Sequence, residues 1–207
     1  VSLQEAQARL MQDLAARIPP RQPSLPEMHQ RYMELKFQDL AMSGEAPDAE
    51  RARQMKQLVN AIQGLLSSRD PDTGKSVGQA LAALFTEGLA GQSRGWRQLL
   101  ESGLAEPSHL AAAGQLLAML GQYSQAADLM ARAAAFFPLS ETVAGDGRPG
   151  PEASSLALQV RQTTVWYFLA ANRVADAKIL ATSFVPYTAR DSGLEKFFRQ
   201  VEALQVN

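Results

Sequence analysis

Apolar residues recur at spacings of three and four along most of this chain, and the alternating pattern of a half-buried strand is nearly absent. That spacing brings apolar side chains onto one face of an α-helix. The clearest example runs from Ala49 to Ser67, where the apolar positions are Met55, Leu58, Val59, Ile62, Leu65 and Leu66. The sequence therefore predicts an all-α protein.

Three helices are predicted in the region 1–68. The first covers Ser2–Ile18 and ends at two prolines, which lack an amide donor. The second begins at Ser24, a suitable N-cap, with Glu27 placed to complete a capping box. The third follows Asp48, which is also a suitable N-cap. We expect these helices to form a docking or dimerisation region, which could join two copies of the chain as a homodimer.

The second predicted helix has an unusually wide apolar surface. Two neighbouring stripes share it, the first made of Met28, Tyr32 and Leu35 and the second of Met33, Phe37 and Leu40. A helix with such a surface is expected to contact more than one neighbour.

Helical patterns continue over about 76–90, 93–102, 108–120 and 124–137, and two or three more helices end the chain. Between these groups lies the segment 140–154, SETVAGDGRPGPEAS, which is rich in Gly, Pro and acidic residues. Such a composition predicts an exposed, flexible loop.

Small residues, turn residues and a closing proline follow one another at a characteristic spacing between Pro107 and Pro138. This segment resembles the tetratricopeptide repeat, a helix-turn-helix unit of about 34 residues. The positions that match are Gly114, Leu117, Gly121, Tyr123, Ala126, Met130, Ala133 and Pro138, whereas Leu110 departs from the family's large aromatic residue. Small side chains at Gly114 and Ala126 would let the two helix backbones approach closely.

A second, degenerate unit can be aligned after the predicted loop, with Val174 in the turn and Ala177, Ala181 and Phe184 in its second helix. A weaker trace lies upstream, where GQALAAL at 78–84 echoes GQLLAML at 114–120. The resemblance implies a right-handed superhelical stack of helical hairpins over 69–207. The alternative is a helical bundle without repeats, in which the same stripes mark only a core.

The composition argues against several functional classes. Lys and Arg number 20 and Asp and Glu number 21, so no basic surface for nucleic acid is predicted. The chain has no cysteine, which excludes disulfides and thiolate chemistry. His29 and His109 belong to no metal-binding or catalytic pattern and are expected to be surface or interface residues. We predict no catalytic residue, metal or cofactor, and hence no enzyme.

No apolar run approaches the roughly 20 residues that a membrane-spanning helix needs. We expect a cytoplasmic location, or a periplasmic one if a leader was removed before Val1.

The family resemblance implies a protein–protein interaction module that binds a peptide or a partner helix in a groove. The groove positions that it assigns to this chain are Gln115, Met119, Gln162, Trp166 and Leu169. It also suggests an adaptor, chaperone or assembly factor, such as those of bacterial secretion or envelope systems. The alternative is a structural subunit that a permanent helical interface holds in a larger complex.

Overall fold

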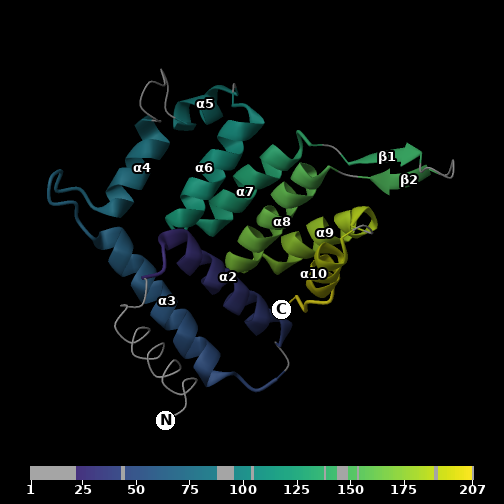
Figure 1. Cartoon of the computed structure of the whole chain (residues 1–207), viewed down its shortest axis with the longest axis horizontal. Coiled ribbons are helices and arrows are strands. Elements are labelled where there is room, and N and C mark those ends of the chain that lie inside the picture. The colour runs from purple at the N-terminus through teal and green to yellow at the C-terminus, as the bar shows by residue number, and fades with distance from the viewer. Residues whose placement is uncertain are drawn as a thin grey trace, which may run out of the picture.

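The computed structural model describes residues 22–42, 45–87, 96–103, 105–137, 139–143, 149–152, 154–188 and 191–206. Figure 1 shows helices packed side by side, with one β-hairpin projecting from an edge of the molecule. The all-α prediction is confirmed for the body of the protein. The predicted helix over Ser2–Ile18 lies outside the described residues.

The helices follow the order that the periodicity predicts. Their bounds are α2 Leu25–Ala41, α3 Ala49–Ser67, α4 Val77–Glu87, α5 Trp96–Ser102, α6 Pro107–Met119, α7 Tyr123–Ala134, α8 Ser155–Ala170, α9 Val174–Phe184, the 3₁₀ turn η1 Val185–Tyr187 and α10 Ser192–Glu202. None of the described helices combines the length and the apolar character that crossing a bilayer requires.

The predicted caps of α2 and α3 are confirmed. The Ser24 backbone amide donates to the Glu27 carboxylate at 2.8 Å, and the Glu27 amide donates back to the Ser24 hydroxyl. Asp48 accepts hydrogen bonds from the amides of Glu50 and Arg51 at 2.9 and 3.1 Å. Each cap pairs amides that a helix start leaves without an intrahelical partner, so both helices begin where the sequence places them.

Helices α6 and α7 form a tight hairpin around Gly114. A Cβ atom built on Gly114 would lie 3.0 Å from the Met130 side chain and 3.3 Å from the Ala126 carbonyl oxygen. Ala126 and Ala133 are fully buried on the facing side of α7. The predicted close approach of these two helices at Gly114 and Ala126 is therefore confirmed.

The turns of the α6–α7 and α8–α9 hairpins share one geometry. Gly121 has φ +78°, and the next amide, that of Gln122, donates to the Leu117 carbonyl at 2.9 Å. In the second hairpin Asn172 has φ +60°, and the next amide, that of Arg173, donates to the Phe168 carbonyl at 2.8 Å. In each turn the amide that follows the left-handed residue donates to the carbonyl five residues earlier, which is the six-to-one hydrogen bond that commonly closes a helix. The two hairpins therefore turn in the same way.

The five helices α6 to α10 pack in sequence order, each against the next. Arg173, at the start of α9, reaches back to Asp128 of α7 at 2.7 Å and also pairs with Asp176 at 2.8 Å. One continuous apolar core runs through these helices, with Val165, Leu169, Ala177, Ala181, Phe198 and Val201 fully enclosed.

Helix α2 lies across this layer, as Figure 1 shows, and packs against α3 on one side and against α6 and α8 on the other. Leu25 and Met28 contact Ile62 and Leu66 of α3, whereas Met33 belongs to the core of α6 to α10. The predicted contact of α2 with more than one neighbour is confirmed. Met33 therefore joins α2 to the core of α6 to α10.

The segment 140–154 departs from the predicted loop. Strand β1, Ser140–Val143, pairs with β2, Pro149–Glu152, in antiparallel register, with Ser140 opposite Glu152 and Val143 opposite Pro149. A two-stranded ribbon tolerates prolines because each strand has one unpaired edge, where a missing amide breaks no ladder bond. The Pro and Gly content therefore misled the prediction.

The packing at Gly114 leads to a stability test. Replacing Gly114 with Val should lower the free energy of unfolding by about 1–3 kcal/mol, because the added atoms meet Met130 and the Ala126 carbonyl. Gly64 of α3 has nothing within 4 Å of a built Cβ, so Gly64→Val is the matched control and should change stability by less than about 0.5 kcal/mol. Urea unfolding followed by circular dichroism measures both. Equal effects would contradict the assigned contact.

Candidate functional site

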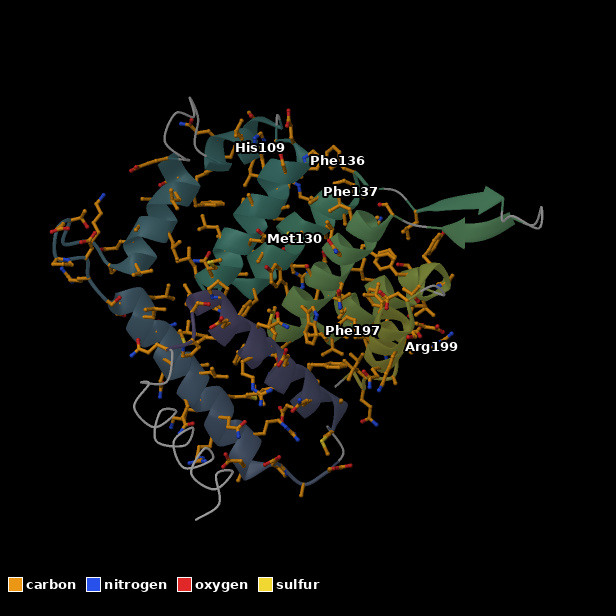
Figure 2. All side chains as sticks on the ribbon, in the orientation of Figure 1. His109, Met130, Phe136, Phe137, Phe197 and Arg199 are labelled. Carbon is orange, nitrogen blue, oxygen red and sulfur yellow. The ribbon has the colours of Figure 1, made fainter. Side chains whose placement is uncertain are left out.

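Three aromatic rings fix the C-terminal half of α2 to the layer beneath it. Phe37 of α2 meets Trp166 of α8 and Phe197 of α10 edge to face, each with ring centroids 5.5 Å apart. Trp166 and Phe197 stack on each other at 4.7 Å, and Figure 2 places Phe197 between α8 and α10. Aromatic pairs in these arrangements add about 0.5–1.5 kcal/mol beyond the area they bury.

A histidine fixes the N-terminal half of α2. The buried His29 ring lies within hydrogen-bond distance of the Met119 carbonyl through Nε2, at 2.7 Å, and of the Tyr123 hydroxyl through Nδ1. A carbonyl only accepts, so Nε2 carries the proton and Nδ1 accepts from the tyrosine. Tyr123 also stacks on Tyr32 of α2 at 5.8 Å. We call Met119, Tyr123, Trp166 and Phe197 the α2-binding face.

Burial keeps the ionisable groups of this contact neutral. It lowers the pKa of His29, although the hydrogen bond to the Met119 carbonyl opposes this shift. It raises the pKa of Tyr32 and, most strongly, that of Tyr123, which the neighbouring Tyr32 and Tyr167 raise further. Burial also raises the pKa of Tyr167 to about 12. Aromatic packing and neutral hydrogen bonds therefore hold α2 in place.

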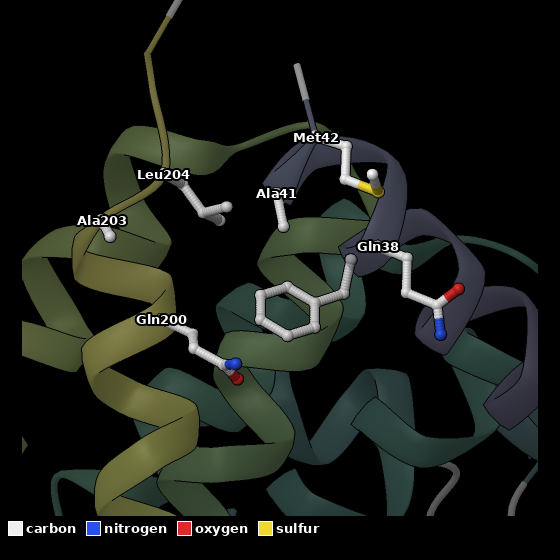
Figure 3. Close-up of a pocket in the computed structure, with 7 residues that line it drawn as sticks. Gln38, Ala41, Met42, Gln200, Ala203 and Leu204 are labelled. Carbon is white, nitrogen blue, oxygen red and sulfur yellow. The ribbon is translucent and has the colours of Figure 1, made fainter. Parts of the chain in front are cut away.

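Beyond the end of α2 the layer is open. A cleft of about 380 Å³ separates the last turns of α2 and α10, and Figure 3 shows the side chains that surround it. Its lining residues are Phe37, Gln38, Ala41, Met42, Gln200, Ala203 and Leu204. The amides of Gln38 and Gln200 stand on opposite walls, and the remaining side chains are apolar. No charged side chain is among these residues.

The five predicted groove residues divide into three groups. Met119 and Trp166 belong to the α2-binding face and are covered by α2. Leu169 is fully buried in the core of α6 to α10. Gln115 is exposed and Gln162 is half-buried. Helix α2 of the same chain thus occupies part of the surface that was assigned to a partner.

Several residues of the site were not singled out as site residues from the sequence. Phe37 was expected only as an apolar position of α2, and Phe197 lies in the last predicted helix, where no site residue was named. The sequence did contain a signal that could have identified His29 as a contact residue. It is a lone histidine within the apolar pattern of α2, next to Met28 and one turn before Met33. Periodicity identifies such a face, but it does not identify the helix that covers it.

No protein-family model matches the chain, and neither a curated protein nor a solved structure shows significant similarity to it. Among the described residues, no group of three or more His, Cys, Asp or Glu side chains is arranged to hold a metal ion. The candidate site is therefore defined by the α2-binding face and the adjoining cleft.

The lowered pKa of His29 predicts a pH dependence of stability. Unfolded His29 titrates near its ordinary value of 6.5, while the folded residue resists protonation. Below pH 6.5 the unfolded chain therefore binds a proton that the folded chain does not, and the free energy of unfolding falls. Above pH 6.5 this stabilisation is fully present.

The measurement is urea unfolding between pH 5 and 8 for the wild type and for His29→Gln. The difference in stability between the two should shrink as the pH falls through 6.5. A difference that stays constant over this range would show that His29 does not titrate as its burial implies.

Proposed function

We propose that this chain is a protein-binding adaptor built on tetratricopeptide-like helical hairpins. The repeated left-handed turn at Gly121 and Asn172 supports this, as do the small residues at the α6–α7 contact. Helical hairpins stacked in sequence order present a continuous surface of the kind that such repeats use for binding. The proposed role is to hold a partner protein, as an adaptor or assembly factor does, and not to catalyse a reaction.

The cleft between α2 and α10 is the observation that carries this proposal. Its volume of about 380 Å³ lies within the range of pockets that hold small ligands or anchoring side chains. The apolar walls formed by Phe37, Met42 and Leu204 suit a large aliphatic or aromatic side chain. Burying such a side chain contributes about 1.5–3 kcal/mol.

The polar groups of the cleft indicate what surrounds that anchor. A glutamine amide both donates and accepts hydrogen bonds, so Gln38 and Gln200 can pair with the backbone of a bound peptide on either side. The lack of charged lining residues argues against a phosphate or an acidic tail, which would need Arg or Lys partners. The proposed ligand is a peptide segment with one apolar anchor.

Peptide selection tests this proposal. A displayed library of random peptides, selected on the full chain, should yield binders that share a large apolar residue. Ala203→Trp fills the cleft from an exposed position and should weaken these binders at least about tenfold.

The matched control is Ala61→Trp, which makes the same substitution at an exposed position of α3 that does not line the cleft. Circular dichroism verifies that both variants are folded. Binders that lose affinity equally with both variants, or with neither, would contradict the cleft as the binding site.

A further inference from the structure

Two different kinds of contact surround α2. Toward α3 the contact is aliphatic, with Leu25 and Met28 against Ile62 and Leu66. Toward α6, α7, α8 and α10 it is aromatic and hydrogen-bonded, through His29, Tyr32 and Phe37. Tyr and Trp are enriched at the centres of protein–protein interfaces. The second contact therefore has the composition of an interface.

The layer beneath α2 has a core of its own. Ala126, Ala133, Val165, Leu169 and Phe198 are among the residues that α6 to α10 enclose completely. Of the α2 residues, Met33 alone belongs to the buried part of this core, while Tyr32, Phe37 and Leu40 pack against it half-buried. Removing α2 would uncover the α2-binding face but leave the packing between these five helices in place.

The polar groups beneath α2 can also be satisfied without it. The Met119 carbonyl is at the C-terminal end of α6, where carbonyl groups have no intrahelical partner and water can serve instead. Tyr123 can likewise donate its hydroxyl proton to water. Exposing this face therefore leaves no buried polar group unpaired, and the barrier to exposing it is mainly the apolar area uncovered.

We infer that α2 is a built-in ligand, and that the face beneath it binds an amphipathic helix of a partner protein that carries the α2 pattern. That pattern places binding side chains at His29, Tyr32, Met33, Phe37 and Leu40, which follow the i, i+3, i+4, i+8, i+11 spacing of one helix face. A partner helix with aromatic residues at the Tyr32 and Phe37 positions makes the same contacts and displaces α2. This inference rests on the proposed function, that the chain binds a partner protein. Phe37, Gln38, Ala41 and Met42 form one wall of the cleft, so a partner helix that replaces α2 would supply that wall in its place.

The α2–α3 hairpin provides a route for the exchange. When α2 leaves the face, it can retain its aliphatic contact with α3, so both helices move together. Residues 68–75, between α3 and α4, are exposed and form a turn around Gly74, which has φ +67°. This turn connects the hairpin to the remaining helices, and the backbone bonds from Val77 to Ser68 and from Asp70 to Lys75 would open or shift when the hairpin moves.

The probe is a labelled peptide with the sequence of residues 22–42, added to the full chain. The wild type should bind it weakly, because its own α2 competes at the millimolar effective concentration of a tethered segment. The Phe37→Ala chain should bind it at least tenfold more tightly, because its internal helix has lost the contacts with Trp166 and Phe197. A peptide that itself carries Phe37→Ala should bind neither chain.

Gln30→Ala is the matched control, because Gln30 lies on α2 but is exposed and bonds only to Glu34 of the same helix. This chain should bind the peptide as weakly as the wild type. A folded Phe37→Ala chain that gains no affinity would overturn the inference. Wild-type dimers that dissociate on addition of the peptide would also overturn it, since they would identify α2 of a second copy as the occupant.

Hydrogen exchange of the wild type keeps the inference testable if Phe37→Ala does not fold. Amides of α2 and α3 should exchange through a partial opening, at least tenfold faster than the slowest amides of α7 to α9. Equal protection in all these helices would mean that α2 is released only by global unfolding, and the inference would fail.

Ala203→Trp separates this inference from the proposed function. The substitution fills the cleft beside Phe37 and Met42, whereas the residues of the α2-binding face do not line the cleft. If it abolishes binding of selected peptides while the 22–42 peptide still binds the Phe37→Ala chain, both proposals hold. Selected peptides that still bind the Ala203→Trp chain would contradict the cleft alone. A 22–42 peptide that gains no affinity for the Phe37→Ala chain would contradict the inference alone.

Discussion

The close approach of α6 and α7 at Gly114 determines where the rest of the site can form. Without a side chain at Gly114, the Ala126 carbonyl and Met130 lie against the α6 backbone. The turn that follows α6 then brings Met119 and Tyr123 next to each other, on the side where His29 reaches both. A wider hairpin would separate the carbonyl from the hydroxyl, and one imidazole ring could not bond to both.

The same constraint extends along the layer. The α8–α9 hairpin closes through a left-handed residue in the same way, which places Trp166 on the side of α8 that faces α2. Phe197 of α10 stacks on Trp166, so one α2 helix meets residues of four helices, α6, α7, α8 and α10. Binding of α2 therefore depends on how the helices of this layer are placed relative to one another. A shift of one helix against the next would change the contacts that Phe37 makes.

The sequence was sufficient where local chemistry decides the structure, as at the Ser24 and Asp48 caps, the turn at Gly121 and the small residues of α6 and α7. It was insufficient where distant segments decide. The 140–154 segment has turn composition, yet it pairs with itself, because Pro149 and Pro151 cost a two-stranded ribbon little. Phe37 was predicted as an apolar position of one helix and Trp166 as a groove position of another, and nothing in the local sequence shows that the two side chains meet.

The absence of charged side chains from the cleft lining, together with the neutral hydrogen bonds of the α2-binding face, determines how any helix is recognised there. Opposite charges chiefly accelerate encounter and exclude wrong partners, and they weaken with salt. A face that lacks them must discriminate by shape, through the depth at which an aromatic ring meets Trp166 and Phe197. The buried His29 adds a directional requirement, since its two nitrogens fit one carbonyl acceptor and one hydroxyl donor in fixed order. A helix bound in the reverse direction would bring the ring contact and the histidine to opposite ends of the face, so the site selects direction as well as sequence.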